Sequence, residues 1–425
     1  MEIIRVRKSE PLKGEVEING AKNAALPILA ASLLNPNETI ISDVPPLKDV
    51  MIMIEVLEAL GAKVEYLDQT TLKINVAEIK TTTTPFELMN KMRASFVVMG
   101  PLLSRMGRAV NGMPGGCQIG ERPIDLHLKG FRALGAKVIE KVDRIEVETD
   151  GKLKGSKIYL DFPSVGATQN IMMAAVLADG ETVIENAAKE PEIVDLSNFL
   201  TKMGAIIRGA GTSTIIIEGV EELKSCEHRI IPDRIEASTF MVAAAMTKGD
   251  VLVKNVIASH IRPVIAKLQE MGCEVIEDPD EDKIRVRSNG KLVATNIRTL
   301  PYPGFPTDVQ AQIMTLMTVA KGESIVEETV FENRFMHVDE LRKMNALIVT
   351  EGNEARVMGV PNLVGAQVRA TDLRAGASLL IAGLVAEGHT DVYDIYHIER
   401  GYYDVIGKFR SLGADMELVT VDVEK

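Results

Sequence analysis

The most reactive side-chain type in the chain stands in an unusual segment. Residues 111–120 read NGMPGGCQIG, so Cys117 lies among glycines, and Arg122 follows shortly after. Glycines let a backbone approach a ligand closely, and such a segment can close over a site and exclude water. A thiol near an arginine can serve as a nucleophile or, while protonated, as a proton donor. The sequence leaves both roles open, beside the alternative of a surface loop with an incidental thiol.

A second group of candidates consists of polar clusters that precede apolar, helix-length segments. These clusters are residues 19–23, 92–95, 163–168, 304–308 and 370–374. Helix N-termini favour phosphate or carboxylate, although Ser, Thr, Asp and Asn at these positions can also simply cap the helix. Capping does not explain Lys22, Arg93 and Arg374, because cations at a helix start oppose its dipole. We therefore expect an anion to be bound among them.

Two further arginines occupy equivalent connections of an internal repeat. Arg400 lies in HIERGY at residues 397–402, and Arg334 ends FENR at residues 331–334. The equivalence places both connections on one face, and solvated surface charge is the alternative at each. His127 and His260 have no metal-ligand spacing with Cys or acidic partners, so we predict neither a metal site nor a cofactor.

The repeat that must position these residues occurs six times. Each copy closes on Gly or Asn after an apolar residue, and the closing positions lie about 70 residues apart. They are Gly61, Gly135, Gly204, Gly272, Asn345 and Gly413. A second Gly or Asn precedes each of them, at Asn37, Gly107, Gly180, Gly249, Gly322 and Gly388. The interval between these two positions is longest in the second copy. The additional residues of this interval lie around Cys117, where we expect the functional site.

Each repeat predicts two kinds of helix joined to short strands. Residues 24–34, 171–177, 313–319 and 379–385 are apolar nearly all round and must be buried. Residues 50–60 show the spacing of an amphipathic helix, and residues 38–41, 62–66, 136–140 and 181–184 are typical of strands. Each helix should close on its Gly or Asn in the left-handed conformation. The alternation predicts an α/β protein, and repeats of this length favour closed domains over an open solenoid.

The repeats divide naturally into two groups of three. Residues 219–233 lack repeat character and are the expected crossover between two three-repeat domains. The segment 1–20, rich in Val and Ile, precedes the first buried helix. From its pattern alone it can complete either domain.

Composition restricts the class of protein. The net charge of −12 and pI near 5.2 argue against a general nucleic-acid or membrane-surface binder, because both partners are polyanionic. No apolar run approaches the roughly 20 residues that span a bilayer, and the first residues lack the apolar core of a signal peptide. We therefore expect a cytoplasmic protein without membrane insertion. Three sparse cysteines fit reduced thiols better than a disulfide framework.

Four dispersed motifs together resemble a known family. They are NGAKNAALP at residues 19–27, GGCQIGERPIDLH at 115–127, GFPTD at 304–308 and HIERG at 397–401. In this order they resemble the UDP-N-acetylglucosamine 1-carboxyvinyltransferases, the enolpyruvyl transferases that open bacterial peptidoglycan synthesis. The resemblance covers essentially the whole chain. It implies a two-domain inverse α/β barrel with buried helices and outer sheets, one domain formed by residues 22–230 and the other by residues 1–21 plus 231–425.

The resemblance also implies a reaction. The family transfers the enolpyruvyl group of phosphoenolpyruvate to the 3'-hydroxyl of UDP-N-acetylglucosamine by addition and elimination through a tetrahedral ketal, and releases phosphate. Cys117 resembles the general acid, which also forms a phospholactoyl thioether, and Asp308 resembles the residue that faces the sugar hydroxyl. Lys22, Arg122 and Arg400 would hold phosphoenolpyruvate, supported by Asp372 and Arg374. The nucleotide sugar would contact Asn23, Arg93, Arg122, Pro123, Ile124, Asp125, Leu126, Phe162, Pro163, Ser164, Val165, Asp308 and Val330, with backbone donors at Ser164 to Gly166 on its diphosphate.

Phe162 departs from the pattern, because some relatives carry a lysine at its position. Two alternatives compete with this interpretation. A 5-enolpyruvylshikimate-3-phosphate synthase shares the fold and the donor but lacks the cysteine loop and uses another acceptor. A non-catalytic repeat scaffold would bind partners without turnover. The sequence makes no prediction of oligomeric state.

Overall fold

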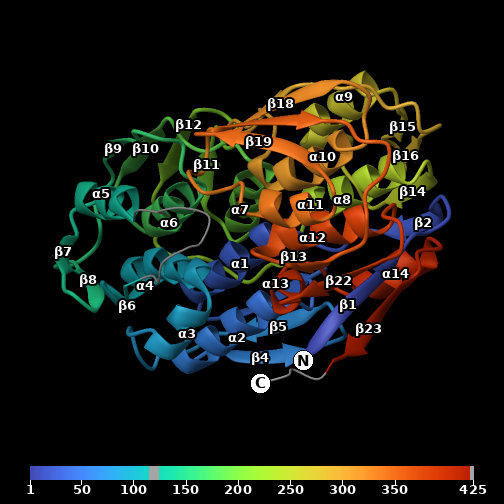
Figure 1. The fold of residues 1–425 in the computed structure, drawn as a ribbon. Helices are drawn as coiled ribbons and strands as arrows, with labels where there is room; N and C mark the ends of the chain where they lie inside the picture. Colours follow the sequence, from blue (N-terminus) through green and yellow to red (C-terminus); the bar gives the residue numbers. More distant parts are fainter. Residues whose placement is uncertain (114–123, 422–425) are drawn as a thin grey trace. The chain divides into compact units, whose positions relative to one another are not determined.

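The computed structural model describes residues 1–113 and 124–421, and of residues 90, 91 and 93–95 the backbone alone (Figure 1). The chain forms two compact units. Among the described residues, the first unit comprises residues 20–113 and 124–231, and the second comprises Met1–Asn19 and residues 232–421. Each unit consists of three sheets around three buried helices.

The first unit has sheets of strand order β13-β3-β5-β4, β6-β8-β7 and β11-β12-β10-β9. Its buried helices are α1 (Lys22–Ala31), α4 (Met99–Met106) and α6 (Val165–Ala175), and its other helical segments are η1 (Ser32–Leu34), α2 (Lys48–Leu60), α3 (Phe86–Lys91), η2 (Arg93–Val98), α5 (Asp125–Ala133) and α7 (Pro191–Lys202). Its strands are β3 (Glu38–Ser42), β4 (Lys63–Tyr66), β5 (Leu72–Asn75), β6 (Arg108–Gly112), β7 (Lys137–Glu140), β8 (Arg144–Glu148), β9 (Lys157–Tyr159), β10 (Glu181–Glu185), β11 (Ile206–Arg208), β12 (Thr214–Glu218) and β13 (Glu227–Arg229).

The second unit has sheets of strand order β15-β16-β14-β2, β17-β18-β20-β19 and β21-β22-β1-β23. Its buried helices are α8 (Arg234–Met246), α10 (Gln310–Met317) and α12 (Leu373–Gly383), and its other helical segments are η3 (Ala258–Ile261), α9 (Arg262–Glu270), η4 (Thr307–Val309), α11 (His337–Lys343), α13 (Tyr396–Glu399) and α14 (Val405–Ser411). Its strands are β1 (Glu2–Arg7), β2 (Lys13–Glu17), β14 (Asp250–Lys254), β15 (Glu274–Asp278), β16 (Lys283–Arg287), β17 (Ile297–Arg298), β18 (Glu323–Glu327), β19 (Leu347–Glu351), β20 (Glu354–Met358), β21 (Gln367–Arg369), β22 (His389–Tyr393) and β23 (Met416–Thr420).

One strand pattern recurs in the sheets. A short strand pairs in parallel with the next, as β9 does with β10, and two antiparallel pairings follow, as β10–β12 and β12–β11 do. In the sheet of β6 a single parallel bridge between Thr83 and Val110 takes the place of the short strand. The predicted order of strands and helices in an α/β repeat is therefore confirmed.

The N-terminal segment, whose place the sequence pattern leaves open, completes two sheets of the second unit. Strand β1 lies between β22 and β23, with Ile4 opposite Val392, and β2 pairs in parallel with β14. In the predicted crossover, β13 pairs in parallel with β3 and so completes a sheet of the first unit.

The helices behave largely as their patterns predict. Helices α1, α6, α10 and α12, which contain the all-round apolar segments, are almost wholly buried. Positive φ angles close the amphipathic helices at all six predicted positions, Asn345 included, and close the buried segments at Gly107, Gly180, Gly322 and Gly388. Two such predictions are wrong. After η1 the chain leaves in an extended conformation at Asn35, so Asn37 needs no left-handed turn.

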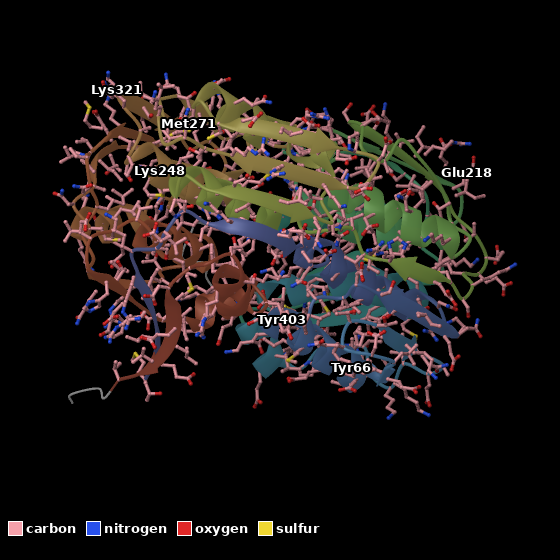
Figure 2. The ribbon with its side chains drawn as sticks, turned by 90° about the vertical axis from the view of Figure 1, so that its right-hand side faces the viewer. Tyr66, Glu218, Lys248, Met271, Lys321 and Tyr403 are labelled. Atoms are coloured by element: carbon pink, nitrogen blue, oxygen red, sulfur yellow. The ribbon has the colours of Figure 1, made fainter. Side chains whose placement is uncertain are left out.

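At the fourth repeat the positive φ belongs to Lys248 rather than to Gly249. Lys248 is labelled in Figure 2. Gly249 serves a different need, because a Cβ there would stand 2.5 Å from the Leu12 carbonyl oxygen. None of the helices in residues 1–113 and 124–421 combines the length and apolar character that a bilayer crossing requires.

Candidate active site

Among the predicted site residues of the second unit, the central feature is a carboxylate held by two arginines. Asp308 Oδ1 accepts a hydrogen bond from Arg334 Nη2 at 2.9 Å, and Oδ2 accepts one from Arg374 Nη2 at 3.1 Å. The two arginine side chains are only 3% and 5% exposed, whereas that of Asp308 is 27% exposed. The carboxylate therefore faces outward while both of its cationic partners lie beneath the surface.

The cations at helix starts, for which the sequence predicts a bound anion, also have partners within the chain. Arg374 lies in the first turn of α12, and its anion in the structure is Asp308. Burial lowers the pKa of Arg374 and the Asp308 charge raises it, with a net rise that keeps the guanidinium charged. Lys22, which begins α1, likewise pairs with the buried carboxylate of Asp49 at 3.0 Å. Each of these cations therefore has a carboxylate partner within the chain, and a bound anion beside them stays a prediction.

Capping, the alternative for the other polar residues, is confirmed at two helices. Asp372 Oδ1 accepts from the Arg374 and Ala375 amides at the start of α12. Ser164 Oγ accepts from the Ala167 amide at the start of α6, at 3.3 Å. Asp308 differs, because η4 begins at Thr307 without a side-chain cap and leaves its carboxylate to the arginines.

Glu328 joins two segments that were predicted to contact the nucleotide sugar. Its buried Oε1 accepts from the Val330 amide at 2.9 Å, the Phe331 amide at 3.2 Å and Thr299 Oγ1 at 2.8 Å. Its Oε2 accepts from Thr307 Oγ1 at 3.0 Å, next to Asp308. One carboxylate therefore fixes both the Val330 turn and the start of η4.

We expect Glu328→Ala to destabilise the protein by about 3 kcal/mol, because it leaves several buried donors without an acceptor. Glu328→Gln keeps one carbonyl oxygen and should cost about 1 kcal/mol. Urea unfolding measures both. The control is Glu327→Ala, which removes a half-exposed pair with Arg298 at 3.3 Å. Equal losses for Glu328→Ala and this control would contradict the role of Glu328.

His337, at the start of α11, is buried close to Arg334 and Asp372. Burial lowers its pKa from 6.5 to about 4, the Asp372 charge opposes that shift, and the Arg334 charge adds to it. Between pH 6.5 and 4 the imidazole is protonated in the unfolded chain and neutral in the folded chain. The free energy of unfolding therefore decreases as the pH falls from 6.5 toward 4. We expect His337→Gln to flatten the acid slope of the unfolding free energy by about 1 kcal/mol per pH unit. Urea unfolding at several pH values measures this slope, and equal slopes of unfolding free energy against pH in the two proteins would contradict the prediction.

Arg400 ends α13 as its C-cap residue and is half-buried. It lies near enough to His397 for its charge, second to burial, to lower the pKa of that imidazole, while the Asp372 and Asp394 charges raise it. The second unit therefore gathers Asp308, Asp372, Arg374 and Arg400 among the starts of α10 and α12 and the end of α13.

In the first unit, the predicted residues lie at the starts of three helices. Lys22 and Asn23 are in the first turn of α1, Ile124 is the N-cap residue of α5, and Asp125 and Leu126 begin that helix. Phe162, which is exposed, and Pro163 lead to Ser164, Val165 and Gly166 at the start of α6. The α5 and α6 starts are adjacent, since a Cβ on Gly166 would stand 3.1 Å from the His127 ring.

The start of α6 narrows the set of backbone donors. The Ser164 amide already donates to the Phe162 carbonyl at 2.7 Å, so this predicted donor is engaged within the chain. Within the part of the chain that the structure describes, no acceptor meets the Val165 and Gly166 amides. These two N–H groups are the ones that the helix start offers to an anion.

Three predicted residues, Cys117, Arg122 and Pro123, lie outside the described residues. Arg93 begins η2, where only its backbone is described. In the described ranges no group of three or more His, Cys, Asp or Glu side chains is arranged for a metal ion.

Sequence reasoning missed three side chains that organise these sites. Arg334 was noted only as the repeat equivalent of Arg400, and that equivalence was the signal for it. Glu328 and Asp49 carried no signal, since nothing in their local sequence distinguishes them from surface carboxylates.

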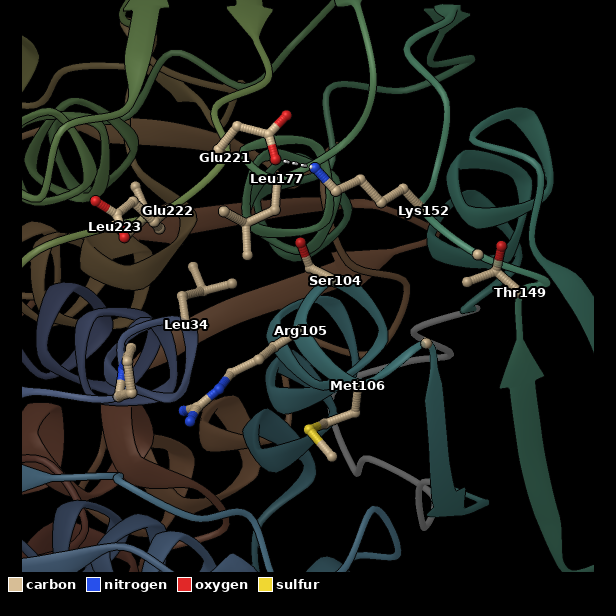
Figure 3. Close-up of a pocket in the computed structure, with 13 residues that line it drawn as sticks. Leu34, Ser104, Arg105, Met106, Thr149, Lys152, Leu177, Glu221, Glu222 and Leu223 are labelled. Carbon is tan, nitrogen blue, oxygen red and sulfur yellow. Dashed lines mark hydrogen bonds and ion pairs between the residues drawn. The ribbon is translucent and has the colours of Figure 1, made fainter.

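A pocket lies elsewhere on the first unit (Figure 3). Its volume is about 490 Å³, and it is lined by the C-terminal ends of the buried segments, including Leu34, Ser104 and Leu177. Arg105 at its wall donates to the carbonyls of Leu33 and Val76. Lys152 pairs with Glu221 at 2.7 Å. Most of the predicted site residues that the structure describes lie instead at or near the N-terminal ends of helices.

Comparison with known proteins agrees with this fold. The family model described as EPSP synthase (3-phosphoshikimate 1-carboxyvinyltransferase) matches residues 6–409. The enolpyruvyl transferase NikO from Streptomyces tendae has the same fold, with a TM-score of 0.89 at 23% identity over 99% of both chains. An EPSP synthase from Acinetobacter baumannii aligns with a TM-score of 0.77 at 17% identity, over 99% of this chain and 100% of its own. The fold is that of the enolpyruvyl transferases, and the predicted inverse α/β barrel class is confirmed.

Sequence relatives narrow the class. A protein of Finegoldia magna named UDP-N-acetylglucosamine 1-carboxyvinyltransferase is 64% identical over 99% of this chain and 100% of its own. One of Caldanaerobacter subterraneus named UDP-N-acetylglucosamine 1-carboxyvinyltransferase 1 is 61% identical over 96% of this chain and 97% of its own. The chain therefore belongs to the UDP-N-acetylglucosamine 1-carboxyvinyltransferase family.

Proposed function

We propose that this enzyme transfers the enolpyruvyl group of phosphoenolpyruvate to the 3'-hydroxyl of UDP-N-acetylglucosamine, releases phosphate and so begins peptidoglycan synthesis. The observation that carries this proposal is the 64% identity, over nearly the full length of both chains, to a relative with that name. The outward-facing Asp308 carboxylate supports it, because a hydroxyl acceptor needs an oriented hydrogen-bond acceptor beside it.

The reaction sets distinct demands on the chain. In the addition step the sugar oxygen attacks C2 of phosphoenolpyruvate and gives its hydroxyl proton to a base, while an acid delivers a proton to C3, which gives a tetrahedral ketal. In the elimination step the ketal loses phosphate and a C3 proton, which restores the double bond. We assign proton delivery at C3 to Cys117, in keeping with the family resemblance, and contact with the sugar hydroxyl to Asp308.

Asp308 suits this task because it is an anchored anion. Two guanidinium groups stabilise its ionised form and hold both oxygens, and its side chain is 27% exposed. The carboxylate therefore orients the hydroxyl and offsets positive charge on its oxygen as the new C–O bond forms.

Anion binding is assigned to the remaining cations. Lys22, Arg122 and Arg400 would hold the phosphate and carboxylate of phosphoenolpyruvate, with Asp372 and Arg374 as support. Lys22 could keep its pair with Asp49, at 3.0 Å in the structure, while it binds phosphoenolpyruvate, because an ammonium has three N–H donors. The nucleotide sugar would use the start of α5, the Val165 and Gly166 amides, Val330, Asn23 and Arg93.

The experiment is a phosphate-release assay with the purified chain. We expect inorganic phosphate from phosphoenolpyruvate only when UDP-N-acetylglucosamine is present, in a one-to-one ratio with the new product. Release that requires shikimate 3-phosphate instead would favour the synthase alternative. No release with either acceptor would favour the non-catalytic scaffold.

Two further statements belong to this proposal. The domains would be residues 22–230 and residues 1–21 plus 231–425, close to the limits of the two compact units. The enzyme would act in the cytoplasm, as expected from the sequence.

A further inference from the structure

A buried phenol lies where the three central helices of the second unit begin. Tyr402, which is 3% exposed, follows Arg400 by two residues, and its amide donates to the Ile398 carbonyl at 3.0 Å. Its hydroxyl oxygen meets one side chain from each buried helix. These are Thr239 Oγ1 of α8 at 2.8 Å, Gln312 Nε2 of α10 at 3.5 Å and Arg374 Nη1 of α12 at 3.4 Å. The helices lie side by side in the unit (Figure 1).

The contacts define which atom donates at each link. Thr239 Oγ1 donates to the Ile235 carbonyl at 2.9 Å, so its remaining role toward Tyr402 is that of acceptor. Tyr402 therefore donates to Thr239, and its lone pairs receive the N–H of Arg374. The result is a directed chain from Arg374 through Tyr402 and Thr239 to the backbone of α8, and successive hydrogen bonds of this kind strengthen one another.

The same network reaches Asp308 by two routes. Arg374 uses Nη1 for Tyr402 and Nη2 for Asp308 Oδ2, so the two contacts fix the plane of one guanidinium. Gln312 Nε2 also donates to the Asp308 carbonyl at 3.0 Å. Burial raises the pKa of Tyr402, so its hydroxyl keeps its proton throughout the assay range.

We propose that Tyr402 is a positioning residue for the transfer reaction: through Arg374 it orients the Asp308 carboxylate, and it ties the turn that carries Arg400 to the starts of α8 and α12. This inference rests on the proposed function, because it gives Asp308 a reacting partner to face. Tyr402 itself touches no substrate in this account.

Tyr402→Phe keeps the ring and removes the hydroxyl, so we expect kcat to fall about 10-fold while KM for each substrate changes less than about 3-fold. The control is Tyr393→Phe, in which a tyrosine stacked under Arg369 loses its hydroxyl. Each rate is divided by the concentration of nucleotide-sugar binding sites, which is titrated in each preparation. If Tyr402 had only a structural role, the substitution would reduce the folded fraction alone, and kcat per binding site would not change.

A second variant tests the chain itself. Thr239→Val removes the acceptor of the phenol proton. Because both substitutions break the same hydrogen-bonded chain, kcat of the double variant should lie within about 2-fold of kcat of Tyr402→Phe. Thr239→Ser restores the acceptor and should restore kcat. Unchanged kcat in Tyr402→Phe, or fully multiplicative losses in the double variant, would overturn the inference. Absence of turnover in the unsubstituted chain would overturn the proposed function, and this inference with it.

Discussion

Cys117→Ala should abolish product formation while nucleotide-sugar binding stays within a few-fold of that of the unsubstituted chain. The expected loss is at least about 10³-fold in kcat, because the variant removes the proposed proton donor to C3 and nothing else in the methyl side chain replaces it. Phosphate release measures turnover, and titration calorimetry with UDP-N-acetylglucosamine measures binding.

The other two cysteines provide matched controls. Burial raises the pKa of the Cys226 and Cys273 thiols to about 11, so both are protonated and unreactive near neutral pH. Cys226→Ala and Cys273→Ala should therefore keep their turnover. If Cys117→Ala retained turnover within 10-fold of the unsubstituted chain, Cys117 would not be the proton donor to C3.

Asp308→Asn should give the second-largest effect, a fall in kcat of about 100-fold or more. The amide preserves shape but removes the charge that orients the sugar hydroxyl. It also leaves Arg334 and Arg374, buried at 3% and 5% exposure, without their anion, so the protein should lose about 2 kcal/mol of stability. Phosphate release and urea unfolding measure the two effects.

The control for Asp308 is Asp339→Asn. Asp339 pairs with Arg342 at 2.7 Å, but its side chain is 78% exposed, so both turnover and stability should hold nearly constant. An Asp308→Asn enzyme with unaltered kcat would show that the carboxylate plays no part in the transfer. A lower kcat with unaltered stability would instead assign the role of Asp308 to the reaction alone.

The fold could be predicted where a local pattern determines it. Segments such as 24–34 and 379–385 are apolar on every side and can only be buried, and residues such as Gly61 and Asn345 accept the positive φ that ends a helix. The place of β1 could not be predicted in this way. Its register, with Ile4 opposite Val392, depends on a partner almost the whole chain away, about which the local alternation of residues contains no information.

The site could be predicted only in part, and for a similar reason. Motif resemblance selected Asp308 and Arg374 but not their mutual contact, nor Glu328 and Tyr402, which hold them in place. The expectation of a bound anion beside Lys22 and Arg374 overlooked carboxylates that come near only in the folded chain. Asp49 lies 27 residues from Lys22, and Asp308 lies 66 residues from Arg374.

The most direct test of the central claim follows the transferred carbon. Phosphoenolpyruvate labelled with carbon-13 at C2 is incubated with the enzyme and UDP-N-acetylglucosamine, and long-range proton–carbon correlation is recorded on the product. We expect a correlation between the labelled carbon and the proton on C3 of the glucosamine ring, in step with phosphate release. A label that stays in phosphoenolpyruvate, or that leaves as pyruvate whether or not the nucleotide sugar is present, would contradict it.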